Sequence, residues 1–159
     1  MVRLSDAEIA NLITEPKPLP GNYKSLMHLR TKKAHRERDL DIQGSGGHQF
    51  RIILRQSALN PLDFSVILAY LPHNTNELFL LRRYNGRSHE HTNSIEGHTF
   101  YAFHIHQATE RYQDLGAKEA TYAEPCTTYA TIEEAAASMF GECGFIIPPE
   151  ISSAQGKLI

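Results

Sequence analysis

The sequence has few cysteines, no long apolar run and little net charge, and each shortage excludes a class of protein. Its two cysteines, Cys126 and Cys143, are too few and too far apart for a disulfide framework or a Cys-x-x-Cys metal site. No segment approaches the roughly 18 consecutive apolar residues of a membrane helix, and the first residues lack the apolar stretch of a signal peptide. We therefore expect a cytoplasmic protein without a membrane partner.

The small net charge argues against a protein that binds nucleic acid through an overall positive charge. The formal net charge is −2 and the isoelectric point is near 6.5, which leaves room only for a local basic surface. The 159 residues are 41% hydrophobic, enough for one domain with a buried core. We expect a single domain over residues 1–147. Residues 148–159 carry two prolines and few core-forming residues, so this tail should be loosely attached.

The order of helix and strand signals predicts an α+β fold. Ser5 and Glu8 form a capping box that begins an N-terminal helix, and Thr131 with Glu134 begins a helix near the C-terminal end. Short apolar stretches between turns predict strands at residues 23–30, 38–43, 48–56, 64–71, 77–85 and 100–106, and residues 107–116 read as a short helix. Because the connections are too short for crossovers, the central sheet should be antiparallel, with the N-terminal and C-terminal helices packed on it.

Histidines gather in one part of the chain. Five of the nine fall within eighteen positions: His89, His91, His98, His104 and His106. We expect residues 77–85 to pair with residues 100–106, with Arg82 opposite Ala102 and Leu80 opposite His104. Side chains alternate across a strand, so this register puts Arg82, Tyr84, His104 and His106 on the face away from the core. His89 and His91 join them only if the loop 86–98 folds back over the sheet.

One interpretation of the cluster is cleavage of RNA without a metal or other cofactor. The reaction needs a base, an acid and a cation, and histidine fills both proton-transfer roles near neutral pH. The predicted catalytic residues are His89, His91, His104, His106, Arg82 and Tyr84, with His104 and His89 as acid and base. The predicted substrate-binding residues are Arg83, Asn85, Arg87, Glu110 and Arg111.

Two other interpretations stay open at this point. His-x-His occurs twice, and His89, His91 and Glu96 have the types and spacing of a facial triad for iron, manganese or zinc. The spacing resembles that of cupin barrels, although Arg83 and Phe103 stand where cupins place flanking glycines. The remaining interpretation is a polar loop and strand face whose histidines are structural or bind a partner protein.

Two resemblances bear on function. The segments "LSDAEI", "LRQSALNPLDFSV", "LRRYNG", "HTNSIEG" and "YAFHIHQATERYQ" resemble an uncharacterised bacterial family often found near mobile elements, over most of residues 4–145. "LRRYNGRSHEH" and the strand and helix after it resemble the TumE toxins of toxin-antitoxin systems, although Ser88 replaces the acidic residue that usually precedes the histidine. The resemblance implies a toxin that is neutralised by a helix-turn-helix antitoxin. The competing class is a non-catalytic inhibitor, from a phage or mobile element, of a host protein.

Overall fold

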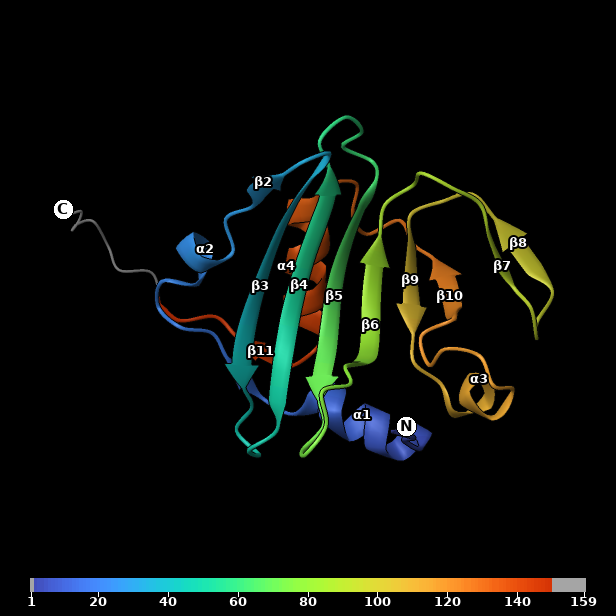
Figure 1. Cartoon of the computed structure of the whole chain (residues 1–159), viewed down its shortest axis with the longest axis horizontal. Coiled ribbons are helices and arrows are strands. Elements are labelled where there is room, and N and C mark those ends of the chain that lie inside the picture. The colour runs from blue at the N-terminus through green and yellow to red at the C-terminus, as the bar shows by residue number, and fades with distance from the viewer. Residues whose placement is uncertain (1, 150–159) are drawn as a thin grey trace.

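A large antiparallel sheet forms the centre of the molecule (Figure 1). In this computed structural model, which describes residues 2–149, seven strands pair in the order β10-β9-β6-β5-β4-β3-β2. Their bounds are β2 Arg30–Lys32, β3 His35–Gln43, β4 Gln49–Ser57, β5 Phe64–Leu71, β6 Phe79–Asn85, β9 His104–Gln107 and β10 Tyr122–Pro125. The predicted α+β class with a central antiparallel sheet is confirmed.

The remaining elements lie around this sheet. The helices are α1 Asp6–Thr14, α2 Tyr23–Leu26, α3 Glu110–Asp114 and α4 Ile132–Glu142. Strands β7 His91–Asn93 and β8 His98–Phe100 form a separate hairpin, and β1 Lys17–Pro18 pairs in parallel with β11 Phe145–Ile146. The predicted caps are confirmed, because Ser5 with Glu8 completes a capping box on α1 and the Thr131 side chain accepts from Glu134 N on α4.

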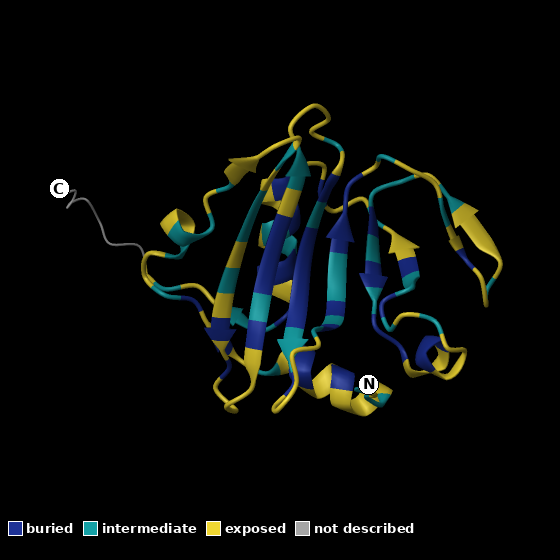
Figure 2. Ribbon diagram, viewed as in Figure 1, coloured by how far each residue is buried: buried dark blue, intermediate teal, exposed yellow. Residues whose placement is uncertain are grey.

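The two faces of the sheet have different roles. On one face, apolar side chains of β4, β5 and β6 are buried against α1 and α4, and α4 lies behind the sheet in Figure 1. We call this the packed face. The opposite side, the open face, buries a smaller apolar group of Ile53, Ile67 and Ala69 and carries most of the charged side chains of β3 and β4. Figure 2 shows that buried residues are concentrated in the central strands of the sheet.

Two of the predicted strands are wrong in part. Residues 23–30 were expected to be extended, but Tyr23–Leu26 is helical, because Tyr23, Leu26 and Met27 have the i, i+3, i+4 spacing that puts apolar side chains on one side of a helix. Residues 100–106 do not form one strand. The chain leaves β8 at Phe100 and enters β9 at His104, since the two strands belong to different sheets.

Other expectations concern the cysteines, the membrane and the tail. Cys126 and Cys143 are both free thiols, as predicted. None of the helices in residues 2–149 has the length and apolar character needed to cross a membrane. Of the tail predicted at residues 148–159, the part from residue 150 onward lies outside the described residues.

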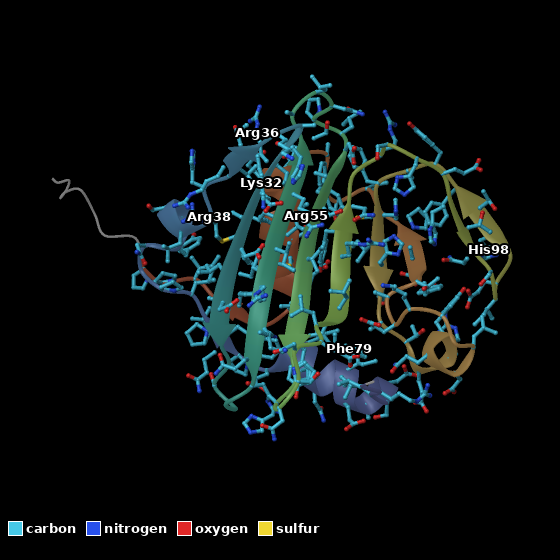
Figure 3. The ribbon with its side chains drawn as sticks, in the orientation of Figure 1. Lys32, Arg36, Arg38, Arg55, Phe79 and His98 are labelled. Atoms are coloured by element: carbon cyan, nitrogen blue, oxygen red, sulfur yellow. The ribbon has the colours of Figure 1, made fainter. Side chains whose placement is uncertain are left out.

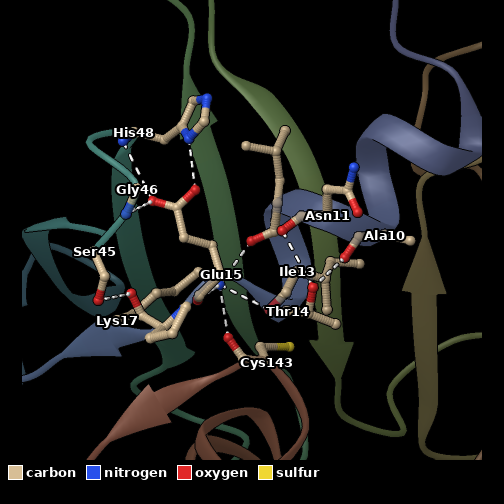
Figure 4. Close-up of polar contacts among 12 residues, drawn as sticks. Ala10, Asn11, Ile13, Thr14, Glu15, Lys17, Ser45, Gly46, His48 and Cys143 are labelled. Atoms are coloured by element: carbon tan, nitrogen blue, oxygen red, sulfur yellow. Dashed lines mark hydrogen bonds and ion pairs between the residues drawn. The ribbon is translucent and has the colours of Figure 1, made fainter.

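A buried lysine ties α1 to α4 (Figure 4). Lys17 has no exposed surface, and its Nζ lies 2.7–2.9 Å from the carbonyl oxygens of Leu12, Ile13, Glu15 and Cys143. These carbonyls are at the C-terminal ends of the two helices, where no further turn supplies a donor. Burial lowers the pKa of Lys17 to about 8, so the side chain still carries its charge at neutral pH.

Replacing this lysine should destabilise the fold strongly. Lys17→Met keeps the length of the side chain but leaves several buried carbonyls without a donor, so we expect the free energy of unfolding to fall by about 2–4 kcal/mol. Urea denaturation followed by circular dichroism measures the change. Lys118→Met, at an exposed position, is the control and should match the wild type. Equal stability of the two variants would contradict a structural role for Lys17.

Candidate active site

A register shift in β6 decides which side chains reach the open face. Ala69 of β5 pairs with Leu80, but the next residue of β5, Leu68, pairs with Arg82, so Leu81 is an extra residue in β6. Such an insertion reverses the alternation of the residues that follow it. Arg83 and Asn85 therefore lie on the open face. The predicted register was wrong, because Arg82 pairs with Gln107 and Asn85 with His104.

Arg82 and Tyr84 consequently lie on the packed face, away from the histidines. Tyr84 is fully buried, and its hydroxyl donates to Glu142 Oε1 at 2.5 Å. Arg82 Nη1 lies 3.6 Å from the same oxygen. The expected place of Arg82 and Tyr84 beside the histidines was wrong, and the pair instead connects β6 to α4.

The loop 86–98 does fold back over the open face. Its hairpin is held by Asn93, which is 2% exposed and whose side-chain amide donates to Ala123 O and accepts from Ala123 N. Asn93 thus pairs with the outer edge of β10 much as a neighbouring strand would. Asn93 is not predictable as part of the site from the sequence, because its partner is 30 residues away in the chain.

Four of the five histidines come together as a result. The ring centroids of His91 and His106 are 4.8 Å apart, those of His104 and His106 are 5.0 Å apart, and His91 stacks on His104 at 5.6 Å. His89 meets His104 at 5.7 Å. His98 is exposed on β8, on the outer side of the hairpin (Figure 3), and is not part of the group. We call His89, His91, His104 and His106 the histidine cluster.

Backbone carbonyls determine the tautomers of the two buried histidines. Nδ1 of His104 donates to Ala102 O at 2.8 Å, and Nδ1 of His106 donates to Ala120 O at 2.9 Å. In a neutral imidazole the other nitrogen then carries a lone pair. Nε2 of both residues is buried and has no hydrogen-bond partner. The cluster therefore contains two buried acceptors that no protein donor satisfies.

His91 is oriented in the opposite sense. Its Nε2 lies 2.9 Å from Asn93 Oδ1, and this oxygen also accepts from Ala123 N. The oxygen acts only as an acceptor, so Nε2 of His91 is the donor. The donor of His91 is thus used on Asn93, and in the neutral ring Nδ1 is the acceptor that is left for a ligand.

Burial keeps the two inner imidazoles neutral. Desolvation, followed by the charge of Arg83, lowers the pKa of His106 to about 3. Desolvation also lowers the pKa of His104. Both rings are consequently uncharged at neutral pH, and their Nε2 atoms are hydrogen-bond acceptors.

Arg83 supplies a positive charge beside this cluster. It pairs with His106 across β6 and β9, and its Nε is buried without a hydrogen-bond partner. None of the ion pairs within residues 2–149 includes Arg83. Burial lowers the pKa of Arg83, but a guanidinium stays charged at neutral pH. A partly buried cation without a counter-ion favours an anionic ligand.

A cavity of about 950 Å³ opens over these groups. Arg83, His89, His91 and His106 line it together with Arg3 and Lys118, and Glu77 and Glu119 are the carboxylates on its wall. Glu119 is engaged, since its Oε2 accepts from Leu80 N. His104 does not line the cavity, but its ring contacts the rings of His91 and His106, which do. Arg3 and Lys118 are not among the site residues predicted from the sequence.

The other predicted substrate-binding residues divide into two groups. Asn85 is on the open face, pairs with His104 and accepts from Ser65 Oγ at 2.8 Å. Arg87 lies over the Phe103 ring, with 5.6 Å between the guanidinium carbon and the ring centroid. Glu110 and Arg111 are occupied elsewhere, and the structure does not bring them to the histidine cluster.

Glu110 and Arg111 make structural contacts. The Glu110 side chain accepts from Asp6 N, which joins α3 to α1. Arg111 Nη2 is 2.8 Å from Glu96 Oε2, and the Tyr112 hydroxyl donates to Glu96 Oε1. Glu96 is therefore held at the far end of the hairpin, and the metal triad of His89, His91 and Glu96 is not assembled. Residues 2–149 contain no group of three or more His, Cys, Asp or Glu placed to hold a metal ion.

Comparisons with protein-family models, curated proteins and solved structures gave no match. The resemblances to the mobile-element family and to the TumE toxins therefore stay predictions. The geometry of the histidine cluster and the cavity is what bears on function.

The buried neutral histidines should make stability depend on pH. The pKa of His106 is lowered in the folded state, so between about pH 6.5 and pH 3 the unfolded chain binds more protons than the folded chain. The free energy of unfolding should therefore fall as the pH falls through this range. His106→Asn keeps a donor near Ala120 O but does not titrate, so its stability should depend less on pH. Denaturation at several pH values checks this, and identical slopes for both proteins would contradict it.

Proposed function

We propose that the chain is a metal-independent ribonuclease that acts on single-stranded RNA at the histidine cluster. The observation that carries the proposal is that the neutral imidazole of His106, whose buried Nε2 atom has no partner, and the unpaired cation of Arg83 line the same cavity. A ribose 2′-hydroxyl is a donor for such an acceptor, and the adjacent phosphodiester is an anion for such a cation.

The reaction is an internal transfer of the phosphoryl group. His106 Nε2 accepts the proton of the 2′-hydroxyl, and the 2′-oxygen forms a bond to phosphorus. The bond from phosphorus to the 5′-oxygen breaks, and protonated His91 donates a proton to the leaving oxygen. The products are a 2′,3′-cyclic phosphate and a 5′-hydroxyl. Arg83 stabilises the charge that develops on the phosphate oxygens.

The substrate itself raises the basicity of His106. An opposite charge within a few ångströms favours the protonated form of an imidazole, so a bound phosphate raises the low pKa of His106 toward neutral pH. His104 positions the ring of His91 by stacking on it at 18°. His89 lines the cavity and binds the phosphate from the loop side. His106 and His91 thus replace His104 and His89 as the proposed base and acid.

An activity of this kind fits a toxin, since it degrades the RNA of the cell that makes it. RNA as substrate and a helix-turn-helix antitoxin as inhibitor belong to the proposal.

The direct test is an incubation of the purified protein with single-stranded RNA in EDTA. We expect cleavage of RNA without added metal and no cleavage of DNA of the same sequence, because DNA lacks the 2′-hydroxyl. RNA that stays intact both in EDTA and with Mg²⁺ would contradict the proposal. The cluster would then be interpreted as a non-catalytic interaction surface.

A further inference from the structure

A single row of polar side chains crosses the open face and ends at the histidine cluster. Strand pairing sets each member opposite the next, from the edge strand β2 to β9. The row consists of Arg30, Glu37, Arg55, Ser65, Asn85 and His104. Because paired residues share a face, all six side chains lie on the side of the sheet that α4 does not cover.

The far end of this row is positively charged and open to solvent. Arg30 and Arg55 are both exposed, and neither bonds to a carboxylate within the described residues. Glu37, which lies between them, is already in contact with His35 at 2.8 Å and Lys32 at 3.4 Å. Hydrogen bonding by His35 is the main reason that the pKa of Glu37 is lowered. The row therefore presents two arginine side chains, Arg30 and Arg55, that form no ion pair within the described residues.

The surface is hollowed along this row. A cavity of about 460 Å³ is bordered by His35, Arg55, Ser57 and Ser65, with Asp63 at its margin. Further along β3, beyond the residues that pair with β2, the open face carries Asp39 and Asp41. The positive charge of this face is therefore confined to the end where β2 pairs with β3. Figure 3 shows Lys32 and Arg55 on the side of the sheet away from β7 and β8.

The length of the row fits an extended polyanion. Five strand spacings of about 4.8 Å separate β2 from β9, so the row spans roughly 24 Å. Arg30 and Arg55, two strands apart, are separated by about 10 Å. Ser65 and Asn85 continue the row toward the histidine cluster and bond to each other, since Ser65 Oγ donates to Asn85 Oδ1 at 2.8 Å.

We propose that single-stranded RNA lies across the open face along this row, with Arg30 and Arg55 binding phosphates remote from the bond that is cleaved. The inference rests on the proposed function, because it is the histidine cluster at the inner end that selects RNA among polyanions. Arg30 and Arg55 contribute to the binding of long substrates and take no part in the chemistry. A substrate too short to reach them is cleaved without their help.

The test separates binding from cleavage. Arg30→Gln/Arg55→Gln removes two charges from the open face. Arg36→Gln/Arg38→Gln is the matched control, because it removes two charges from the neighbouring positions that point to the packed face. Binding is measured by fluorescence anisotropy on a 12-nucleotide 2′-O-methyl RNA, which cannot be cleaved. Cleavage is measured on a dinucleotide.

For Arg30→Gln/Arg55→Gln we expect the Kd for the 12-mer to rise about tenfold at low salt, and the slope of log K against log salt to become shallower by about 1.4. The dinucleotide should be cleaved at the wild-type rate. The control variant should bind the 12-mer within about twofold of the wild type.

Wild-type binding of the 12-mer by Arg30→Gln/Arg55→Gln would overturn the inference and leave the proposed cleavage site untouched. Equal loss of binding in the control variant would also overturn it, because the effect would then reflect net charge. Poly-glutamate that competes as well as RNA would overturn RNA as the occupant. If the wild type binds the 12-mer through these arginines but cleaves no RNA, the proposed function fails and the binding surface stands.

Discussion

His106→Asn should reduce the rate of RNA cleavage by about 10²- to 10⁴-fold, the contribution typical of general acid–base catalysis by one side chain. Asparagine places an amide donor near the position of Nδ1, so the bond to Ala120 O is kept while Nε2 is lost. The fold should remain intact by circular dichroism. Initial rates on a fluorescent RNA in EDTA measure the effect.

The neighbouring histidines make this result specific. His91→Gln should cause a loss of similar size, because it removes the proposed acid. His98→Asn is the control, since His98 is exposed on β8 outside the cluster. His106→Asn or His91→Gln cleaving within threefold of the wild type would show that the cluster is not the catalytic site.

Arg83→Met should lower kcat/KM by about 10²- to 10³-fold, as expected for the loss of one group that stabilises charge in the transition state. The same variant should be at least as stable as the wild type. An unpaired guanidinium beside two imidazoles is unfavourable to bury, and methionine removes that charge while it fills similar space. Loss of activity together with unchanged or raised stability is typical of a residue retained for function.

The adjacent arginine gives the contrast. Arg82 faces the packed side, where it contacts Tyr84 and Glu142. Arg82→Met should lower the melting temperature, while the folded fraction cleaves RNA at the wild-type rate. Rates and melting temperatures measured on both variants decide the matter. The reverse pattern, with Arg82→Met inactive and Arg83→Met active, would contradict the register that places Arg83 in the site.

The parts of the fold that local sequence determines were predictable. Ser5 and Thr131 begin the two main helices through side-chain caps, which depend only on residues three positions away. Strand β5 matches the predicted residues 64–71, because its apolar run lies between clear turn residues. The antiparallel order of β3, β4, β5 and β6 follows from their short connections.

The composition of the site was predictable only in part. The alternation of His104 and His106 was read correctly, since nothing interrupts β9 and both rings lie on the open face. The same reasoning failed for β6, where the extra residue Leu81 exchanges the faces of Arg82 and Arg83. No local pattern marks such an insertion, because it depends on pairing with β5.

The position of the loop was also beyond local reasoning. His89 and His91 reach the cluster only because Asn93 binds the backbone of Ala123 at the edge of β10. A single side-chain amide that pairs with a strand edge leaves no periodic signal in the sequence. Glu96 likewise matched a metal-ligand spacing, but Arg111 and Tyr112 hold it elsewhere.

The most direct test of the catalytic assignment uses one RNA oligonucleotide in two forms, unmodified and with a single 2′-deoxy nucleotide at the position that the protein cleaves. Mass spectrometry of the products formed in EDTA should show a 2′,3′-cyclic phosphate and a 5′-hydroxyl from the unmodified RNA, and an intact phosphodiester at the 2′-deoxy position. Cleavage at the 2′-deoxy position, or no cleavage of either RNA, would contradict a ribonuclease in which His106 activates the 2′-hydroxyl.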